Sequence, residues 1–265
     1  MGSAIAQRAV LEGYSVTSLS RRGKIDSSST PSSSSDTKSI DYRIGDARDK
    51  SSIESILNEG GYTAIVHAIG LLFDGQSGLG NYNRLVSGSG SVPDATSSYD
   101  DITRLTAMNA IDAAEAYVQK RMRNPISSAF SKQPQAQLPF VFTSAAEAGW
   151  PDMAGGSFVE NNIAPEWLRR YLKAKRQVEA RLLKSVSDDK ALLRPIIFRP
   201  SLIYSMDKLG QLPPVGAFFI GNALGLPFVD RPVTVQSLSQ AVIRAIDNSQ
   251  VTGTQRYMQI DELNK

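Results

Sequence analysis

Residues 63–69 read Thr63-Ala64-Ile65-Val66-His67-Ala68-Ile69, a nearly continuous apolar run that is followed by Gly70. A strand buried on both faces of a parallel sheet has this composition, because neither face needs polar side chains. Four further segments have the character of strands, at 14–20, 40–44, 140–143 and 196–198. The sequence therefore predicts a protein built around a sheet.

Helical patterns alternate with these strands. They fall at 4–12, 51–58, 99–119, 167–184 and 233–246. The helix at 51–58 is expected to open on a capping box of Ser51 and Glu54. Alternating strands and helices favour a doubly wound parallel α/β sheet with helices on both faces. We expect one domain over residues 1–265, with a small substrate-side portion around 201–232.

The composition excludes several classes of protein. The 265 residues are 41% hydrophobic and 21% charged, the balance of an ordinary globular domain. The absence of cysteine excludes disulfides, a thiol nucleophile and thiolate metal sites. A single histidine, His67, rules out a His-rich metal site and disfavours a Ser-His-Asp hydrolase, so no metal is expected. The net charge of +3 forms no concentrated basic stripe, so nucleic acid is not an expected partner.

Ligands of doubly wound sheets bind outside the carboxyl ends of the strands, so the residues that follow each strand matter most. Arg21 and Arg22 follow the strand at 14–20, where an NAD-binding sheet usually has an acidic residue for the ribose hydroxyls. Guanidinium groups at this point favour NADP(H), because they bind a 2′-phosphate. An ordinary basic turn is the alternative.

Two further strand ends carry candidate cofactor contacts. Asp46 follows the strand at 40–44, where a carboxylate either accepts a hydrogen bond from an adenine amino group or belongs to a simple turn. Ala68 and Gly70 close the run at 63–69, and their small size allows backbone to approach a dinucleotide. We expect His67 to be a packed core residue rather than a catalyst.

The fourth strand end carries the candidate chemistry. Ser144 follows the strand at 140–143, and Tyr171 and Lys175 lie four residues apart, on one face of the helix at 167–184. A lysine ammonium beside a phenol is expected to lower the phenol pKa, so that the tyrosine exchanges a proton with a carbonyl or alcohol. A Tyr-x-x-x-Lys pattern alone is a common accident, but a preceding strand-end serine and a following Arg199-Pro200-Ser201 make this one informative.

Together these motifs resemble the extended and atypical short-chain dehydrogenase/reductase superfamily over nearly the whole chain. The resemblance implies a Rossmann-type NAD(P)-binding fold, with Ser144, Tyr171 and Lys175 as the catalytic trio and Asn109 completing the active-site group. It also implies that Gly2 stands for the third glycine of the glycine-rich loop, Asp46 for the adenine contact, and Arg199, Pro200 and Ser201 for the motif that flanks the nicotinamide. The first strand and the first two glycines are missing here, so we expect them, with any targeting segment, upstream of Met1.

One branch of this superfamily is similar in several local phrases, among them residues 98–101, 171–179, 194–200 and 232–238. That branch holds the nucleotide-binding accessory subunit of complex I and the Coq-type proteins of ubiquinone biosynthesis. The resemblance implies a mitochondrial protein, peripheral on the matrix side, or alternatively a plastid one. It also implies association with a membrane surface or a multiprotein complex.

Three functions remain open at this stage. The first is an NADP(H)-preferring oxidoreductase acting on a quinone intermediate or another hydrophobic small molecule. The second is a non-catalytic assembly or accessory subunit that holds NADP(H) structurally, and the third is a sugar-nucleotide epimerase or dehydratase. Residues 213–229, which include Phe218 and Phe219, are expected to form either an apolar wall beside the nicotinamide or plain core.

Overall fold

The computed structural model describes residues 1–23, 40–80, 96–123, 137–186, 191–205, 220, 224 and 228–265. The serine tract at 27–35 and most of the expected apolar wall, including Phe218 and Phe219, lie outside these residues. The prediction about that wall therefore stays a prediction.

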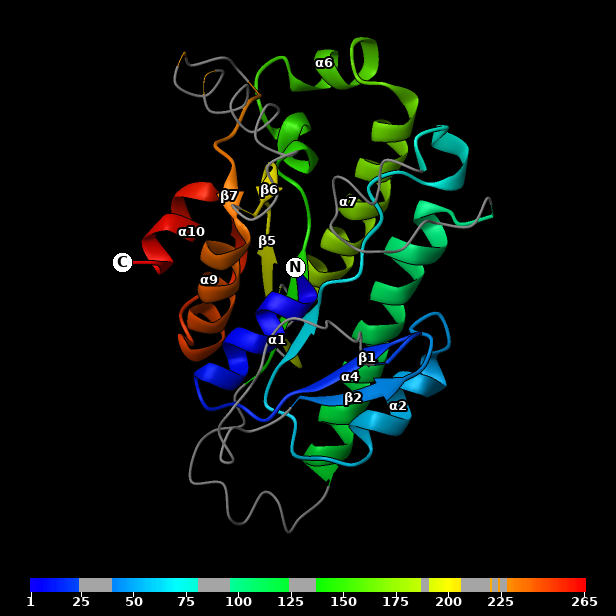
Figure 1. Ribbon diagram of the computed structural model, residues 1–265, viewed down its shortest axis with the longest axis vertical. Coiled ribbons are helices and arrows are strands. Elements are labelled where there is room, and N and C mark those ends of the chain that lie inside the picture. The colour runs from blue at the N-terminus through cyan, green and yellow to red at the C-terminus, as the bar shows by residue number, and fades with distance from the viewer. Residues whose placement is uncertain are drawn as a thin grey trace.

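Strands and helices alternate along the described chain (Figure 1). The strands are β1 (Thr17–Ser20), β2 (Asp41–Ile44), β3 (Ile65–His67), β4 (Leu138–Thr143), β5 (Leu193–Phe198), β6 (Ile203–Tyr204), β7 (Val233–Thr234) and β8 (Gly253–Gln255). The α-helices are α1 (Gly2–Leu11), α2 (Lys50–Leu57), α4 (Thr106–Arg123), α6 (Gly156–Asn162), α7 (Glu166–Val186), α9 (Val235–Asp247) and α10 (Tyr257–Leu263). Shorter turns are η1 (Gly75–Ser77), the π-helical η3 (Asp100–Leu105) and the 3-10 helix η4 (Ala146–Asp152).

The central sheet is parallel and has the strand order β3-β4-β5-β8. Its register places His67 opposite Phe142 and Thr143 opposite Phe198, so that the carboxyl ends of β3, β4 and β5 meet at one edge. Strands β1 and β2 form a separate parallel pair. Within the described residues no strand joins β1 to β3, at the position where the sequence predicts a missing first strand.

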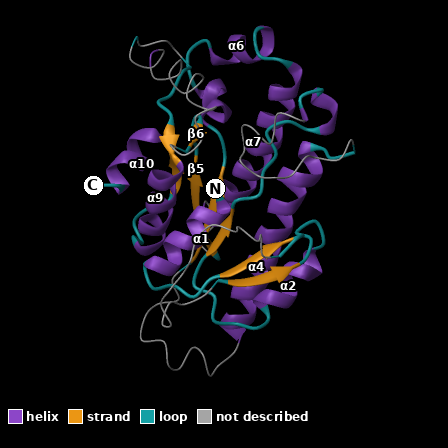
Figure 2. Ribbon diagram, viewed as in Figure 1, coloured by secondary structure: helices purple, strands orange, loops and turns teal. Residues whose placement is uncertain are grey.

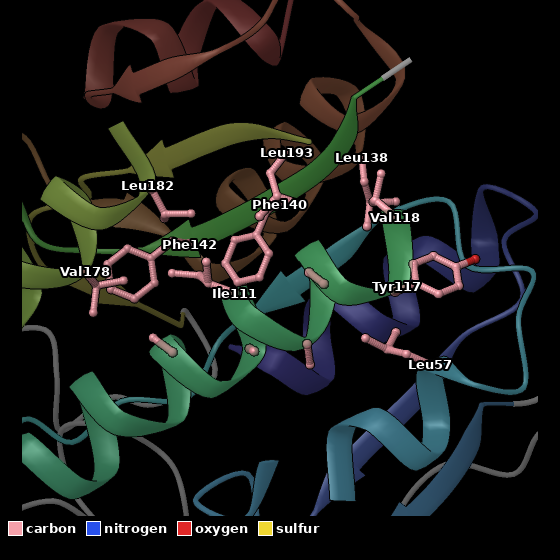
Figure 3. Close-up of a cluster of buried hydrophobic side chains, with 14 of the residues drawn as sticks. Leu57, Ile111, Tyr117, Val118, Leu138, Phe140, Phe142, Val178, Leu182 and Leu193 are labelled. Atoms are coloured by element: carbon pink, nitrogen blue, oxygen red, sulfur yellow. The ribbon is translucent and has the colours of Figure 1, made fainter. Parts of the chain in front are cut away.

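Helices cover both faces of the central sheet, because alternate residues of β4 and β5 point to opposite sides. Phe140, Phe142 and Ile197 pack with residues of α4 and α7, and Figure 3 shows Phe142 beside Val178 and Ile111, and Phe140 beside Ile111. On the other face, the cluster combines residues of β4 and β5 with residues of α1, α9 and α10. Figure 2 shows these helical layers around the strands. The predicted doubly wound α/β fold is confirmed.

Several element boundaries differ from the predicted ones. Helix α2 begins one residue before Ser51, because the Asp49 carboxylate accepts the Ser51 N–H and caps the helix, so the Ser51–Glu54 capping box is wrong. Residues 233 and 234 are a strand paired with β6 rather than the start of a helix. The Thr234 hydroxyl then caps α9. The other predicted strands and long helices fall near their predicted places, whereas β6, β8, α6 and α10 were not predicted.

None of the described helices combines the length and the apolar character that crossing a bilayer requires. Nor do the described parts of the chain contain a group of three or more His, Asp or Glu side chains placed to hold a metal ion.

Candidate active site

The candidate active site lies where β3, β4 and β5 end. Hydrogen bonds fasten the segments that leave β4 and β5 to each other: Ser144 N–H donates to Phe198 O at 2.7 Å, and Ala146 N–H donates to Pro200 O at 2.9 Å. Parallel strands that end together leave backbone and small side chains available to a ligand at this edge. The sheet therefore brings the regions of Ser144 and Pro200 together, as the sequence predicts.

Lys175 is the best-defined polar group of the site. It projects from α7 and is buried, and its Nζ donates to Thr143 O, one residue before Ser144, at 2.6 Å. The same nitrogen lies 4.9 Å from the ring centroid of Phe142 and 5.5 Å from that of Tyr171. A Cβ atom added to Gly70 would lie 3.5 Å from Nζ, so Gly70 also borders the lysine. Burial lowers the pKa of Lys175 from its ordinary 10.5 to about 8.

The effect of Lys175→Met on stability is expected to depend on pH. The folded protein releases the Lys175 proton near pH 8, whereas the unfolded chain holds it to about 10.5. Between these values unfolding takes up a proton, so rising pH favours the folded wild type. The variant's free energy of unfolding should therefore fall relative to wild type as pH rises from about 8 to about 10.5. Urea titrations across this range measure it, with Lys173→Met, at an exposed lysine of the same helix, as the matched control.

The pKa of the Tyr171 phenol is shifted in the opposite direction from the one expected. Its pKa is raised rather than lowered, first by burial and then by the nearby Glu147 carboxyl and the Tyr99 phenol. The Lys175 ammonium is hydrogen-bonded to a backbone carbonyl instead of the phenol, so it does not offset the burial. The expectation of a depressed phenol pKa is therefore wrong for this structure. A phenol that stays protonated at neutral pH is suited to give a proton to a carbonyl oxygen.

Unpartnered polar atoms lie at or just after the ends of β3, β4 and β5. Buried atoms without a hydrogen-bond partner in the described structure include Thr143 Oγ1, Ser144 Oγ, Ser201 Oγ and His67 Nδ1. Buried polar atoms are normally hydrogen-bonded. Several buried atoms without a partner at one sheet edge therefore indicate a place where a polar ligand would supply the missing hydrogen bonds. Ser144 and Ser201 were both predicted site residues.

His67 is held in the core, as expected. Its Nε2 lies 3.0 Å from Thr106 Oγ1, and the Thr106 hydroxyl donates to Ile102 O at 2.7 Å. Because that hydroxyl proton is already used, His67 Nε2 must be the donor, which leaves Nδ1 as a bare acceptor. Burial and then the positive charge of Lys175 lower the His67 pKa to about 3, so the ring is neutral.

Two predicted site residues make structural contacts. The Arg199 guanidinium donates from Nε and Nη2 to the two carboxylate oxygens of buried Glu179, at 2.9 and 2.6 Å. The Asn109 amide donates to the carbonyls of Ala47 and Arg48, at 3.1 and 2.8 Å. These contacts direct both side chains to protein groups, and Asn109 ties α4 to the turn after β2.

The predicted cofactor contacts gather around the other strand ends. Gly2 lies beside Ala68, because a Cβ atom on Gly2 would be 3.5 Å from the Ala68 Cβ, which places the start of α1 at the end of β3. Arg21 and Arg22 are exposed after β1. The Asp46 carboxylate accepts from Arg48 Nε at 3.1 and 2.9 Å, and this bond, with attraction from Arg21, lowers the Asp46 pKa. Arg21 and Asp46 are thus neighbours.

Two residues of the site, Glu147 and Tyr99, were not predicted from the sequence. Glu147 lies on η4, three residues after Ser144, and burial, together with the charge of Asp230, raises its pKa to about 7. Tyr99 is buried and its ring contacts that of Tyr171. The position of Glu147 near Ser144 was visible in the sequence, but no local pattern linked Tyr99 to a residue so far along the chain.

Solved structures with the same fold include several nicotinamide-dependent enzymes. UDP-glucose 4-epimerase of Thermus thermophilus in complex with NAD is 18% identical with a TM-score of 0.55, over 96% of this chain and 73% of that one. Escherichia coli serine dehydrogenase is 14% identical with a TM-score of 0.55, over 96% and 91%. ElxO with NADP bound is 14% identical with a TM-score of 0.58, over 96% and 90%. The chain has the Rossmann-type fold of dehydrogenases and epimerases.

Among curated proteins, the chain is similar to MIOREX complex component 2 of Saccharomyces cerevisiae. The two are 25% identical over 278 residues, which cover 96% of this chain and 92% of the yeast protein. No protein-family model matches the sequence. The branch that contains the complex I and Coq-type proteins stays a prediction from the sequence.

Proposed function

We propose that this protein is an NADP(H)-dependent reductase of the short-chain dehydrogenase type that acts on a carbonyl or quinone group of an apolar substrate. The observation that carries the proposal is the Lys175 ammonium, which is bound to the end of β4 beside Ser144 and stands over the ring of Tyr171. The protonated state of the Tyr171 phenol favours the reducing direction, in which the protein supplies a proton.

Ser144, Tyr171 and Lys175 have separate roles in the proposed reduction. Ser144 Oγ is a buried hydroxyl free to hydrogen-bond the substrate oxygen, and Tyr171 donates a proton to that oxygen. Lys175 lies with its Nζ 5.5 Å from the Tyr171 ring centroid, and its hydrogen bond to Thr143 O holds the helix that carries the phenol against the end of β4. NADPH, when bound, supplies the hydride that reduces the carbonyl carbon, so the products are an alcohol or hydroquinone and NADP⁺.

The residues present fit a nicotinamide nucleotide in three respects. Buried hydroxyl oxygens of Thr143, Ser144 and Ser201 have no hydrogen-bond partner at the sheet edge. Gly70 has no side chain, so a nucleotide could approach its backbone beside Lys175. At the other end, the exposed Arg21 and Arg22 would hold the 2′-phosphate of NADP(H), with Asp46 beside them toward the adenine.

NADPH is expected to bind more tightly than NADH, and the Arg21→Ala/Arg22→Ala double variant should lose this preference. Charge-assisted hydrogen bonds to phosphate contribute about 1.5–3 kcal/mol each, so the loss should be about 10-fold or more for NADPH and small for NADH. Fluorescence titration with both nucleotides measures it. An NADH preference that survives both replacements would contradict the assignment.

A second candidate function is a non-catalytic subunit that holds NADP(H) as a structural ligand within a multiprotein complex. The engagement of Arg199 by Glu179 and of Asn109 by backbone carbonyls favours it, because both side chains then serve the fold. The likeness to a yeast protein that is named as a complex component also supports it. We place either form of the protein in mitochondria, peripheral to the membrane on the matrix side, on the strength of the family resemblance.

Nucleotide oxidation separates these candidates. The purified protein is incubated with NADPH and, in turn, with short-chain ubiquinones, prenylated aldehydes or ketones, and UDP-sugars. Oxidation of NADPH that requires an apolar carbonyl or quinone supports the reductase. Tight nucleotide binding without oxidation supports the structural subunit, and conversion of a UDP-sugar without net oxidation would replace both with the epimerase alternative.

A further inference from the structure

We infer that Tyr99, Asp74 and Arg170 form a clamp that holds the Tyr171 phenol in its working orientation, so that Tyr99 and Asp74 are positioning residues. The inference rests on the proposed function, because it assigns these residues to the proton donor of that reaction. Asp74 lies in the segment that follows β3, and Tyr99 directly precedes η3. Both positions are far from α7 in the sequence.

The first contact of the clamp is between two aromatic rings. Tyr99 is 3% exposed, and its ring meets that of Tyr171 edge to face, with centroids 5.6 Å apart and planes at 64°. Such a pair has a preferred geometry, so the buried Tyr99 ring restricts the directions in which the Tyr171 phenol can point.

The hydroxyl of Tyr99 is fixed as well. It donates to Leu72 O at 2.8 Å and accepts from Asp74 N–H at 3.2 Å. Tyr99 is therefore anchored at both ends, by its ring on Tyr171 and by its hydroxyl on the backbone of residues 72–74.

The same backbone segment is fastened to α7. The Asp74 carboxylate is 2% exposed and accepts from Arg170 Nη2 at 3.1 and 3.3 Å, and Arg170 directly precedes Tyr171. One residue before Asp74, the ring of Phe73 meets that of Trp167 at 4.8 Å. Segment 72–74 thus holds both the helix that carries Tyr171 and the ring that contacts it.

This arrangement matters for chemistry because proton transfer depends on position. A displacement of about 1 Å at a reacting group can cost about 100-fold in rate. Without the clamp, Tyr171 would keep its packing against Ala145, Ala148 and Leu172 but lose the ring contact that fixes the direction of the phenol. We therefore expect loss of the clamp to lower kcat more than it raises KM or the Kd for NADPH.

The kinetic test compares Tyr99→Leu, Tyr99→Phe and Asp74→Asn with the wild type. Tyr99→Leu and Asp74→Asn should lower kcat by about 10- to 100-fold, while Tyr99→Phe, which keeps the ring, should lose less. In a Tyr171→Phe background, Tyr99→Leu should have no further effect on kcat, because the group that it positions is gone. Equal losses in both backgrounds would overturn the inference.

The chain supplies a matched control in Tyr117. Its ring also packs edge to face on a tyrosine, Tyr62, at 6.3 Å and 72°, and its hydroxyl likewise donates to a carbonyl and accepts from an amide of a loop. Tyr117→Leu should destabilise the protein comparably and leave kcat unchanged. A loss of kcat in Tyr117→Leu equal to that in Tyr99→Leu would make the effect a general one of stability and overturn the inference.

A readout independent of activity separates the clamp from the proposed function. Fluorotyrosine placed at position 171 should give one narrow ¹⁹F resonance in the wild-type background and in Tyr117→Leu, and a broadened or divided one in Tyr99→Leu. If the protein oxidises no NADPH but the resonance responds in this way, the clamp stands and the reductase proposal fails. A resonance unchanged by Tyr99→Leu and by Asp74→Asn would overturn the clamp, whatever the activity.

Discussion

Tyr171→Phe is expected to lower NADPH-dependent turnover by about 10²- to 10⁴-fold, the usual loss when a general acid is removed. The phenylalanine ring keeps the edge-to-face contact with Tyr99 and the apolar packing around Ala145 and Leu172. Stability and the Kd for NADPH should therefore change little. Steady-state kinetics and a nucleotide titration on the same preparation measure both quantities.

The matched control for this variant is Tyr257→Phe, because Tyr257 is a half-buried tyrosine on α10, outside the candidate site. It should keep full turnover. In cells that lack the native protein, full rescue by Tyr171→Phe, scored by quinone levels and by assembly of respiratory complexes, would contradict the reductase and favour the structural subunit.

The sequence was sufficient to predict the parts of this site that depend on local geometry. Tyr171 and Lys175 share a helix face because they are four residues apart, and Ser144 lies at the site because it directly follows a buried strand. Parallel strands bring their carboxyl ends to one edge whatever the details of packing. The fold class follows from the same local patterns.

Contacts set by packing between distant elements were not predictable. Tyr99 meets Tyr171 because η3 and α7 lie against one another, and no spacing rule connects these two positions. The Tyr171 pKa was misjudged for a related reason: the four-residue spacing gives the distance to Lys175 but not the burial of the phenol or the nearness of Glu147. The pairing of Arg199, which follows β5, with Glu179 of α7 likewise depends on how these two elements pack.

The pairing of Arg199 with Glu179 makes a strong prediction about stability. The Glu179 side chain is 3% exposed and that of Arg199 13%, and their bidentate contact raises the Arg199 pKa. Removing one partner of a buried pair costs up to about 3–5 kcal/mol, because the other charge stays desolvated. Glu179→Leu leaves Arg199 with only the exposed Asp152 carboxylate, at 3.5 Å, so it should lower the free energy of unfolding by up to about that amount.

The control is Glu54→Ala, which breaks the exposed Lys50–Glu54 pair on α2 and should cost at most about 1 kcal/mol. The double variant Glu179→Leu/Arg199→Met should recover most of the loss, because neither charge is then buried alone. Urea unfolding measures all three. If Glu179→Leu is harmless to stability while Arg199→Met weakens NADPH binding, the guanidinium serves the nucleotide, as the sequence predicted, and its bond to Glu179 is secondary. If instead the single variant is strongly destabilised and the double variant recovers, Arg199 holds α7 against the end of β5.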